Sequence, residues 1–250
     1  MRESWVAQRI FRPGRREVLL SGRFVYLEKK ESRDFMKAKL CGMKTLAAAQ
    51  AAEAAGATFI GFIFWPKSHR YIAPEQAAAI AAQLHRVKTV GVFVDEAPER
   101  VNAIAAEVGL DFVQLHGHED AAYAAKIERP VIKAYRYGEG FDAKAAATFP
   151  ADYILLDSGT AKLPGGTGRR FAWREAAQAV DEVPELRSRL LIAGGVAEDN
   201  VAEIESIFHP FGVDVSGSLE VEGEKSIEKI ESFMKAVKAL DAEHREGAAS

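Results

Sequence analysis

The chain has 250 residues, of which 48% are hydrophobic and 28% are charged, a composition typical of a globular protein with a substantial core. Its 33 Lys and Arg residues against 36 Asp and Glu give a net charge of −3, whereas nucleic-acid-binding proteins usually carry a basic excess. The longest apolar runs are strand-sized, far short of the roughly 20 residues that a membrane-spanning helix needs. We therefore expect a soluble protein that binds neither nucleic acid nor membrane.

The chain contains one cysteine, Cys41. A single cysteine cannot form an intrachain disulfide or build a thiolate metal site. It gives no support to an oxidising compartment, so we expect a cytoplasmic protein. The histidines show no metal-ligand spacing, and we predict no metal ion.

The first 35 residues differ in composition from the rest. They hold 9 basic and 5 acidic residues, a net charge of +4, while residues 36–250 carry 24 basic and 31 acidic residues, a net charge of −7. The segment lacks the apolar stretch and cleavage site of a secretory signal, and no apolar region follows Arg15 and Arg16 as a twin-arginine signal requires. We predict an extension over residues 1–35, either loosely ordered or an upstream misread start with Met36 as the true initiator, and a catalytic domain over 36–250.

From Lys37 onward, short β-rich apolar runs alternate with Ala-rich segments of helical period. The predicted strands are 37–43, 59–64, 89–94, 112–115, 131–135, 153–156, 190–192 and 213–215. The helices that follow them in turn are 45–56, 73–87, 97–109, 119–127, 142–148, 173–183, 197–208 and 226–240. Gly56 is a typical helix terminator, and Pro74 suits a first helical turn.

Strands that are continuously apolar indicate a parallel sheet covered by helices on both faces. An open doubly wound sheet and a closed eight-stranded barrel both fit such a repeat. Eight units favour the barrel, and the first strand ends in Leu40-Cys41-Gly42-Met43 without the Gly-x-Gly-x-x-Gly fingerprint of an open dinucleotide-binding sheet. We predict an α/β fold, a single-domain (β/α)8 TIM barrel with an N-terminal extension.

Reactive residues stand at the ends of several predicted strands, where a barrel gathers its active site. Cys41 ends the first strand beside a glycine; a packing role is common for cysteine, but this position favours a catalytic thiol. Asp157 ends the sixth strand, as a site carboxylate or a turn former. Asp214 lies between two valines in the eighth strand and faces opposite to both, as a site residue or a member of a structural ion pair.

Glycines after the last two predicted strands are typical of a phosphate site. Gly194 and Gly195 follow the seventh strand, and Ser216 and Gly217 follow the eighth. Exposed backbone N–H groups and helix N-termini attract anions, and barrels commonly hold phosphate on these two loops.

Three further features lie in loops that would border the pocket. Arg70 precedes the second helix, as a surface charge or as a planar fork for a substrate carboxylate. His116 follows the fourth strand and is either a proton donor or acceptor or a hydrogen-bonding substrate-binding residue. The glycine-rich loop at 163–168 is too long for a mere connector, and we interpret it as a mobile lid rather than a further set of anion-binding amides.

Ten segments that include these residues follow one another along the chain: 39–43, 61–64, 66–72, 91–94, 114–117, 155–158, 165–168, 171–173, 193–195 and 213–217. In this order they resemble the phosphoribosylanthranilate isomerase family, (β/α)8 enzymes of tryptophan biosynthesis, over about residues 37–240. The chain departs from the common family pattern Ser-Ser-Gly-Val-Glu in having Ser-Gly-Ser-Leu-Glu at 216–220. Lys44 stands where Thr or Arg is more usual.

The resemblance implies an Amadori rearrangement of N-(5-phosphoribosyl)anthranilate to 1-(2-carboxyphenylamino)-1-deoxyribulose 5-phosphate, without cofactor or metal. It implies that Asp157 is the general acid, which protonates the ribose ring oxygen, and that Cys41 is the general base, which removes a proton from the sugar C2. The implied binding roles are Arg70 for the anthranilate carboxylate, Asp214 for the sugar or in support of the acid, and the amides around Gly194, Gly195, Ser216 and Gly217 for the phosphate.

Two alternatives remain at this stage, because a fold alone does not fix a function. Another sugar-phosphate isomerase or synthase on the same barrel is the nearer one, although it would need a different acid and base from Cys41 and Asp157. A non-catalytic binder of a phosphorylated ligand is the second. The sequence makes no prediction about the oligomeric state.

Overall fold

The computed structural model of the chain describes residues 15–20, 23–28, 36–138, 141–157 and 173–248. The chain divides into two compact units, Met1–Asp34 and Phe35–Ser250. In the first unit, β1 (Arg15–Leu20) pairs with the antiparallel strand β2 (Arg23–Glu28). The sequence pattern predicts neither strand, and the origin of residues 1–35 stays a prediction.

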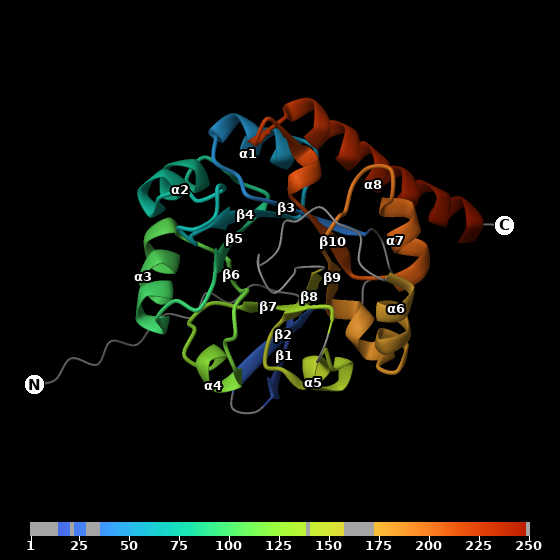
Figure 1. Cartoon of the computed structure of the whole chain (residues 1–250), viewed down its shortest axis with the longest axis horizontal. Helices are drawn as coiled ribbons and strands as arrows, with labels where there is room; N and C mark the ends of the chain where they lie inside the picture. Colours follow the sequence, from blue (N-terminus) through green and yellow to red (C-terminus); the bar gives the residue numbers. More distant parts are fainter. Residues whose placement is uncertain (1–14, 21–22, 29–35, 139–140, 158–172, 249–250) are drawn as a thin grey trace, which may run out of the picture. The chain divides into compact units, whose positions relative to one another are not determined.

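Eight parallel strands of the second unit close into a barrel (Figure 1). Around the ring they are β10 (Gly212–Val215), β3 (Lys37–Cys41), β4 (Phe59–Ile63), β5 (Lys88–Phe93), β6 (Phe112–Leu115), β7 (Val131–Arg136), β8 (Tyr153–Asp157) and β9 (Leu190–Ile192). Each lies within two residues of its predicted bounds at either end. The predicted (β/α)8 barrel is therefore confirmed.

A helix follows each strand, and together the helices surround the barrel (Figure 1). They are α1 (Leu46–Ala54), α2 (Pro74–Ala81), α3 (Pro98–Val108), α4 (Ala121–Ala124), α5 (Ala143–Thr148), α6 (Trp173–Asp181), α7 (Val201–Phe208) and α8 (Ile227–Ala248). None of the described helices combines the length and the apolar character that crossing a membrane requires.

Helix α2 ends six residues before the predicted bound, because the carboxylate of Glu53 competes for the backbone that follows it. Glu53 Oε1 accepts hydrogen bonds from the amides of His85, Arg86 and Val87 at 2.7, 2.6 and 3.1 Å. A carboxylate on another helix thus replaces the last helical turn with a bound loop.

Helix α4 also begins later than predicted, because Glu119, the first residue of the predicted helix, binds neighbouring loops and a lysine instead. Its carboxylate accepts from the amides of Asp95 and Gly117, both at 2.9 Å, and pairs with Lys133 Nζ at 2.8 Å. The helix begins only after Asp120, whose side chain caps it by accepting from the amide of Tyr123.

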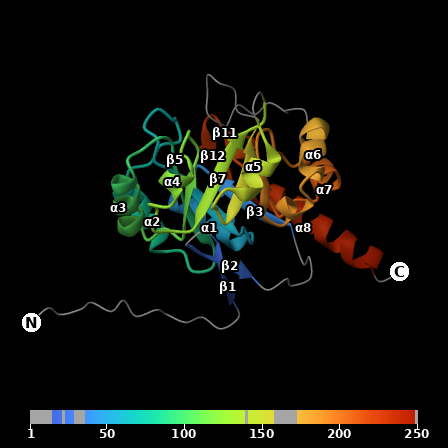
Figure 2. The same ribbon diagram turned by 90° about the horizontal axis from the view of Figure 1, so that it is seen from below.

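Four short elements were not predicted. They are the 3₁₀ helices η1 (Pro184–Arg189) and η2 (Gly217–Leu219) and the paired strands β11 (Glu220–Val221) and β12 (Glu224–Lys225). The last three lie between β10 and α8, and Figure 2 shows β11 and β12 toward one end of the barrel strands. They place Glu220 and Lys225 close to the carboxyl ends of β10 and β3.

The core has two layers. One packs the outer face of the strands against the helices, and the other fills the barrel with Phe59, Val90, Ile132, Leu155 and Leu191. At the amino-terminal ends of the strands, the inner layer consists of four aromatic residues, Phe59, Phe112, Tyr153 and Phe211, which we call the aromatic floor. Its ring centroids lie 4.7 to 5.8 Å apart along the chain of contacts. Because these residues begin or precede their strands, the aromatic floor closes the amino-terminal end of the barrel.

Candidate active site

The strand register turns the predicted catalytic side chains into the barrel. Paired residues of parallel strands point to the same side, and Lys39 pairs with Phe59 of the inner layer. Cys41 lies two residues beyond Lys39, and Asp157 lies two residues beyond Leu155, so both share this inward face. The two residues are 5% and 3% exposed. Both stand at the carboxyl end of their strands, at the mouth of the barrel.

Asp157 and His116 lie side by side at this mouth. His116 Nε2 is 3.4 Å from Asp157 Oδ2, and the side-chain amide nitrogen of Gln114 is 2.9 Å from His116 Nδ1. Gln114 contacts Nδ1, so Nε2 is the ring nitrogen that faces the carboxylate, and among the described residues it has no hydrogen-bond partner. Within the described part of the chain, the buried Asp157 Oδ1 has no hydrogen-bond partner. That oxygen is therefore available to a ligand.

Asp214 forms a buried ion pair with a residue that the sequence analysis did not select. Its Oδ1 accepts from Lys39 Nζ at 2.8 Å, and the two side chains are 9% and 0% exposed. The pair joins neighbouring strands β10 and β3, where Asp214 and Lys39 are register partners. An ion pair was one of the two alternatives for Asp214, and it does not exclude a contact with substrate from the second carboxylate oxygen.

Cys41 is held closely by its surroundings. A Cβ atom on Gly61 of β4 would lie 2.6 Å from the Cys41 sulfur, so only glycine leaves room for the thiol. The Ser216 hydroxyl donates to the Cys41 carbonyl at 3.0 Å. Burial and the negative charge of Asp214 raise the pKa of the Cys41 thiol above its ordinary value, and the positive charges of Lys39 and Lys225 offset part of that rise.

Arg70 lies against the end of β3 and is paired with Glu220. Its Cδ atom would be 2.7 Å from a Cβ on Gly42, the residue after Cys41. Its Nε and Nη2 donate to the two carboxylate oxygens of Glu220 at 2.5 and 2.9 Å. Lys225 Nζ donates to Glu220 Oε1 at 2.6 Å as well as to the Ser216 carbonyl at 3.0 Å. Arg70 and Ser216 were predicted from the sequence as binding residues, whereas Glu220 and Lys225 were not.

The residues around Glu220 strongly favour its ionised form. Burial raises the pKa of Glu220, but hydrogen bonds from Arg70 and Lys225 outweigh it and lower the pKa to about 2. The cluster therefore holds one anion between two cations. Its net charge is positive, which suits a negatively charged ligand.

The predicted phosphate loops meet beside this cluster. Gly194 and Gly195 have φ angles of 78° and 77°, a left-handed conformation that favours glycine. Asn200 fixes the turn by donating to the Gly195 carbonyl at 2.9 Å and accepting from the Ala197 amide at 3.0 Å. The Ser218 hydroxyl, one residue after Gly217, donates to the Val196 carbonyl at 2.7 Å. The loops after β9 and β10 are thus bonded to each other.

The lid predicted at 163–168 lies outside the described residues. For a metal, the described ranges contain no group of three or more His, Cys, Asp or Glu side chains that could hold an ion.

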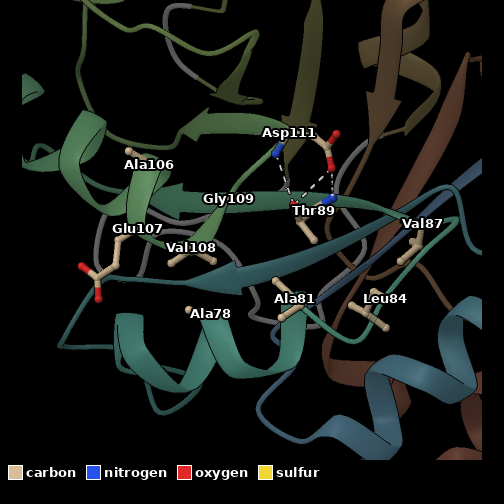
Figure 3. A pocket seen from close by; sticks show the side chains of 11 residues that line it. Ala78, Ala81, Leu84, Val87, Thr89, Ala106, Glu107, Val108, Gly109 and Asp111 are labelled. Atoms are coloured by element: carbon tan, nitrogen blue, oxygen red, sulfur yellow. Dashed lines mark hydrogen bonds between the residues drawn. The ribbon is translucent and has the colours of Figure 1, made fainter.

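A hollow lies between α2 and α3, away from Cys41 and Asp157. Figure 3 shows the residues that line it. It is lined by apolar residues such as Ala78, Leu84 and Val108, with Thr89 and Asp111 hydrogen-bonded at its inner wall. Thr89 and Asp111 stand at the amino-terminal ends of β5 and β6. The hollow is therefore at the opposite end of the strands from Cys41 and Asp157.

Comparison with known proteins gives one consistent result. The family model described as N-(5'phosphoribosyl)anthranilate (PRA) isomerase matches residues 38–236. The N-(5'-phosphoribosyl)anthranilate isomerase of Geobacter sp. (strain M21) is 41% identical over 206 residues, which cover 82% of this chain and 98% of the relative. The enzyme of the same name from Listeria welshimeri is 40% identical over 207 residues, covering 82% and 100%.

Solved structures agree. Phosphoribosyl anthranilate isomerase from Thermus thermophilus has a TM-score of 0.73 and 33% identity, covering 82% of this chain and all of that one. A phosphoribosyl anthranilate isomerase in complex with reduced 1-(o-carboxyphenylamino)-1-deoxyribulose 5-phosphate has a TM-score of 0.69 and 35% identity, with the same coverage. The chain therefore belongs to the N-(5'-phosphoribosyl)anthranilate isomerase family.

Proposed function

We propose that this chain converts N-(5'-phosphoribosyl)anthranilate to 1-(2-carboxyphenylamino)-1-deoxyribulose 5-phosphate, with Asp157 as general acid and Cys41 as general base. Family membership carries the isomerase activity and its place in tryptophan biosynthesis. One observation supports the two residue roles above all. The buried side chains of Cys41 and Asp157 share the inward face of the barrel and the same mouth, although they come from β3 and β8.

Asp157 would begin the reaction. Its carboxyl group gives a proton to the ribose ring oxygen, the bond between that oxygen and C1 breaks, and the ring opens to a Schiff base. The buried Oδ1 atom, which has no partner in the described part of the barrel, would face the sugar. His116, 3.4 Å from Oδ2, would orient the carboxylate that remains.

Cys41 would complete the reaction as a thiolate. Its sulfur takes the proton from C2, and the electron pair of that bond forms a C1–C2 double bond and neutralises the Schiff-base nitrogen. The resulting enolamine becomes the ketone when the proton of the C2 hydroxyl moves to C1. A proton donor and a proton acceptor at one pocket suit a reaction that delivers a proton at one atom and removes it at another.

The remaining residues would bind the substrate. Arg70 keeps three of its five N–H donors beyond the two that Glu220 takes, and we assign these to the anthranilate carboxylate. Asp214 would bind a sugar hydroxyl through the oxygen that Lys39 leaves free. The backbone amides at Gly194, Gly195, Ser216 and Gly217 would hold the phosphate.

We also propose that residues 36–250 form the catalytic domain of a cytoplasmic enzyme and that residues 1–35 are an extension or a misread start. The family match over residues 38–236 supports this division. N-terminal sequencing of the protein made from its native gene tests the start. A terminus at Met1 or Arg2 would contradict the misread start.

The activity is tested on the full chain with N-(5'-phosphoribosyl)anthranilate as substrate. We expect turnover by the wild type and a loss of kcat of at least about 100-fold in both Cys41→Ala and Asp157→Asn, the scale of a removed acid or base. Both variants should still bind the reduced product analogue, measured by calorimetry. Turnover that is unchanged in either variant would contradict the role of that residue, and a wild type that binds the analogue without turnover would contradict the activity.

A further inference from the structure

Lys39 is a fully buried lysine that the reaction steps above do not use. It lies in the middle of β3 with no exposed surface, and its ammonium group is 2.8 Å from Asp214 Oδ1. Two charges taken out of water cost several kcal/mol per ion, and well-packed apolar residues are often as stable in such a place. Packing alone therefore does not account for a lysine here.

The position of Lys39 relates it to Cys41. The two residues are separated by one position on the same strand, so their side chains point to the same inward face. Burial lowers the pKa of Lys39, but the charges of Asp214 and Cys41 raise it above its ordinary value, so the side chain is an ammonium ion. Among the groups that oppose the effect of burial on the pKa of Cys41, Lys39 acts most strongly, through its charge and a hydrogen bond.

We propose that Lys39 is a positioning residue for the isomerisation, whose buried ammonium group holds the Cys41 sulfur in place as the thiolate that accepts the C2 proton. The inference rests on the proposed role of Cys41 as the base. Lys39 keeps its own proton throughout. The thiolate gains the C2 proton and becomes a thiol, and before the next turnover it releases that proton to solvent while Asp157 takes one up to replace the proton it gave to the ring oxygen. Asp214 balances the lysine charge while the sulfur is a neutral thiol.

Other charged groups surround the thiol on neighbouring elements. Asp214 of β10 and Lys225 of β12 act on the thiol directly. Glu220 of β11 and Arg70 after β4 interact with Lys225, and Asp157 of β8 and His116 after β6 interact with Asp214. Lys225 is the second cation near the sulfur, but Glu220 and Ser216 already accept its hydrogen bonds. Among the described residues, the hydrogen bond of Lys39 goes to Asp214 alone. Lys39 is also the more deeply buried of the two cations.

The test follows the ionisation of the sulfur directly. Because Cys41 is the only cysteine, the ultraviolet absorbance of its thiolate can be titrated in the full chain, with Cys41→Ser in each background as the blank. Lys39→Met removes the ammonium group and keeps a side chain of similar length. Lys133→Met is the matched control, since Lys133 is a buried lysine in a 2.8 Å pair with Glu119 on the outward face of β7.

In Lys39→Met we expect the thiolate to form only at higher pH than in the wild type. The value of kcat at neutral pH should fall about tenfold and recover as the pH is raised, because the thiolate fraction limits the rate. Lys133→Met should leave the thiol titration where it is in the wild type. A purely structural role of Lys39 would lower stability in both variants and move neither titration.

An unmoved thiol titration in folded Lys39→Met, or the same shift in Lys133→Met, would overturn the proposal. If circular dichroism shows that Lys39→Met is unfolded, the double variant Lys39→Met/Asp214→Asn decides, since it leaves no buried charge unpaired. Its thiol should also ionise at higher pH than in the wild type, and an unmoved midpoint would overturn the proposal. Failure of the base role itself is distinguishable, because it appears as full activity in Cys41→Ala.

Discussion

Glu220 holds Arg70 by both of its carboxylate oxygens. The two hydrogen bonds, at 2.5 and 2.9 Å, join a residue after β4 to one that follows η2, 150 positions later in the chain. A bidentate contact fixes the plane of the guanidinium group as well as its position. Glu220 therefore decides in which direction the remaining N–H groups of Arg70 point.

Replacing Glu220 with glutamine should weaken substrate binding more than it slows the chemistry. The amide leaves Arg70 with one neutral acceptor in place of two charged ones, so the guanidinium group loses its fixed orientation. We expect KM to rise about tenfold, the scale of one lost charge-assisted hydrogen bond, and kcat to change less. Steady-state kinetics on the full chain measure both.

Glu224→Gln is the matched control for that change. Glu224 lies on the same hairpin but is exposed and pairs with Lys44 at 2.6 Å. Its replacement should leave KM unchanged, since exposed ion pairs contribute little. Equal KM values for Glu220→Gln and the wild type would show that Arg70 does not need its partner.

The Glu220 carboxylate should make the free energy of unfolding depend on pH in the acid range. Arg70 and Lys225 lower the pKa of Glu220 from 4.5 to about 2, so the unfolded chain binds this proton more readily than the folded one. The stabilisation is fully present above pH 4.5 and is lost as the pH falls toward 2. Urea unfolding across this range should show a steeper loss of the free energy of unfolding in the wild type than in Glu220→Gln. Identical slopes would contradict the assignment.

Gly61→Ala should displace the Cys41 thiol. The new Cβ would lie 2.6 Å from the sulfur and 3.2 Å from the Cys41 Cα, so the sulfur must move. We expect kcat to fall about 100-fold, as for a reactive group shifted by about 1 Å, and the free energy of unfolding to fall by about 1 to 3 kcal/mol. Kinetics and urea unfolding measure the two effects.

Gly91→Ala separates overpacking from damage to the site. A Cβ on Gly91 would press on Leu110, Phe93 and Phe64, which belong to the layer between the strands and the helices. The variant should lose comparable stability and retain kcat at temperatures where it is folded. A kcat that falls equally in both variants would mean that the barrel, rather than the thiol, is sensitive to strain.

The buried pair of Glu119 and Lys133 should contribute strongly to stability. Both side chains are almost fully buried, and Glu119 also accepts two backbone hydrogen bonds that shape the loops after β5 and β6. Glu119→Gln leaves the lysine charge uncompensated, and we expect a loss of about 3 kcal/mol in the free energy of unfolding. Replacing both residues together, as Glu119→Gln/Lys133→Met, should cost less than the two single changes added. An additive result would show that the two residues do not interact.

Much of the fold could be predicted from the sequence because burial on both faces leaves a direct trace in it. The strand Tyr153–Asp157 is an example, because Ile, Leu and Leu follow Tyr153 without a polar residue between them. Such a strand can be recognised from its own sequence, without knowledge of the neighbouring strands. Helix ends were harder. Helix α2 stops at Ala81 because Glu53 on α1 binds the loop that follows, and no local pattern shows where a distant carboxylate will lie.

Some residues of the candidate site could likewise be predicted from the local sequence, and others could not. Cys41 and Asp157 were found because a reactive side chain at the end of an apolar strand stands out locally. Glu220 and Lys225 were missed because their roles depend on a hairpin that brings them to Arg70 and Ser216. Lys39 did leave a signal: a lysine two positions before Cys41 must share its face of the strand.

The aromatic floor affects how substrate enters the enzyme and how product leaves it. Phe59, Phe112, Tyr153 and Phe211 fill the amino-terminal end of the barrel, whereas Cys41 and Asp157 stand at the carboxyl ends of the strands. Substrate and product therefore enter and leave on the same side of the barrel. Accumulated product therefore competes with incoming substrate, and a cell that draws the product away quickly keeps the enzyme working.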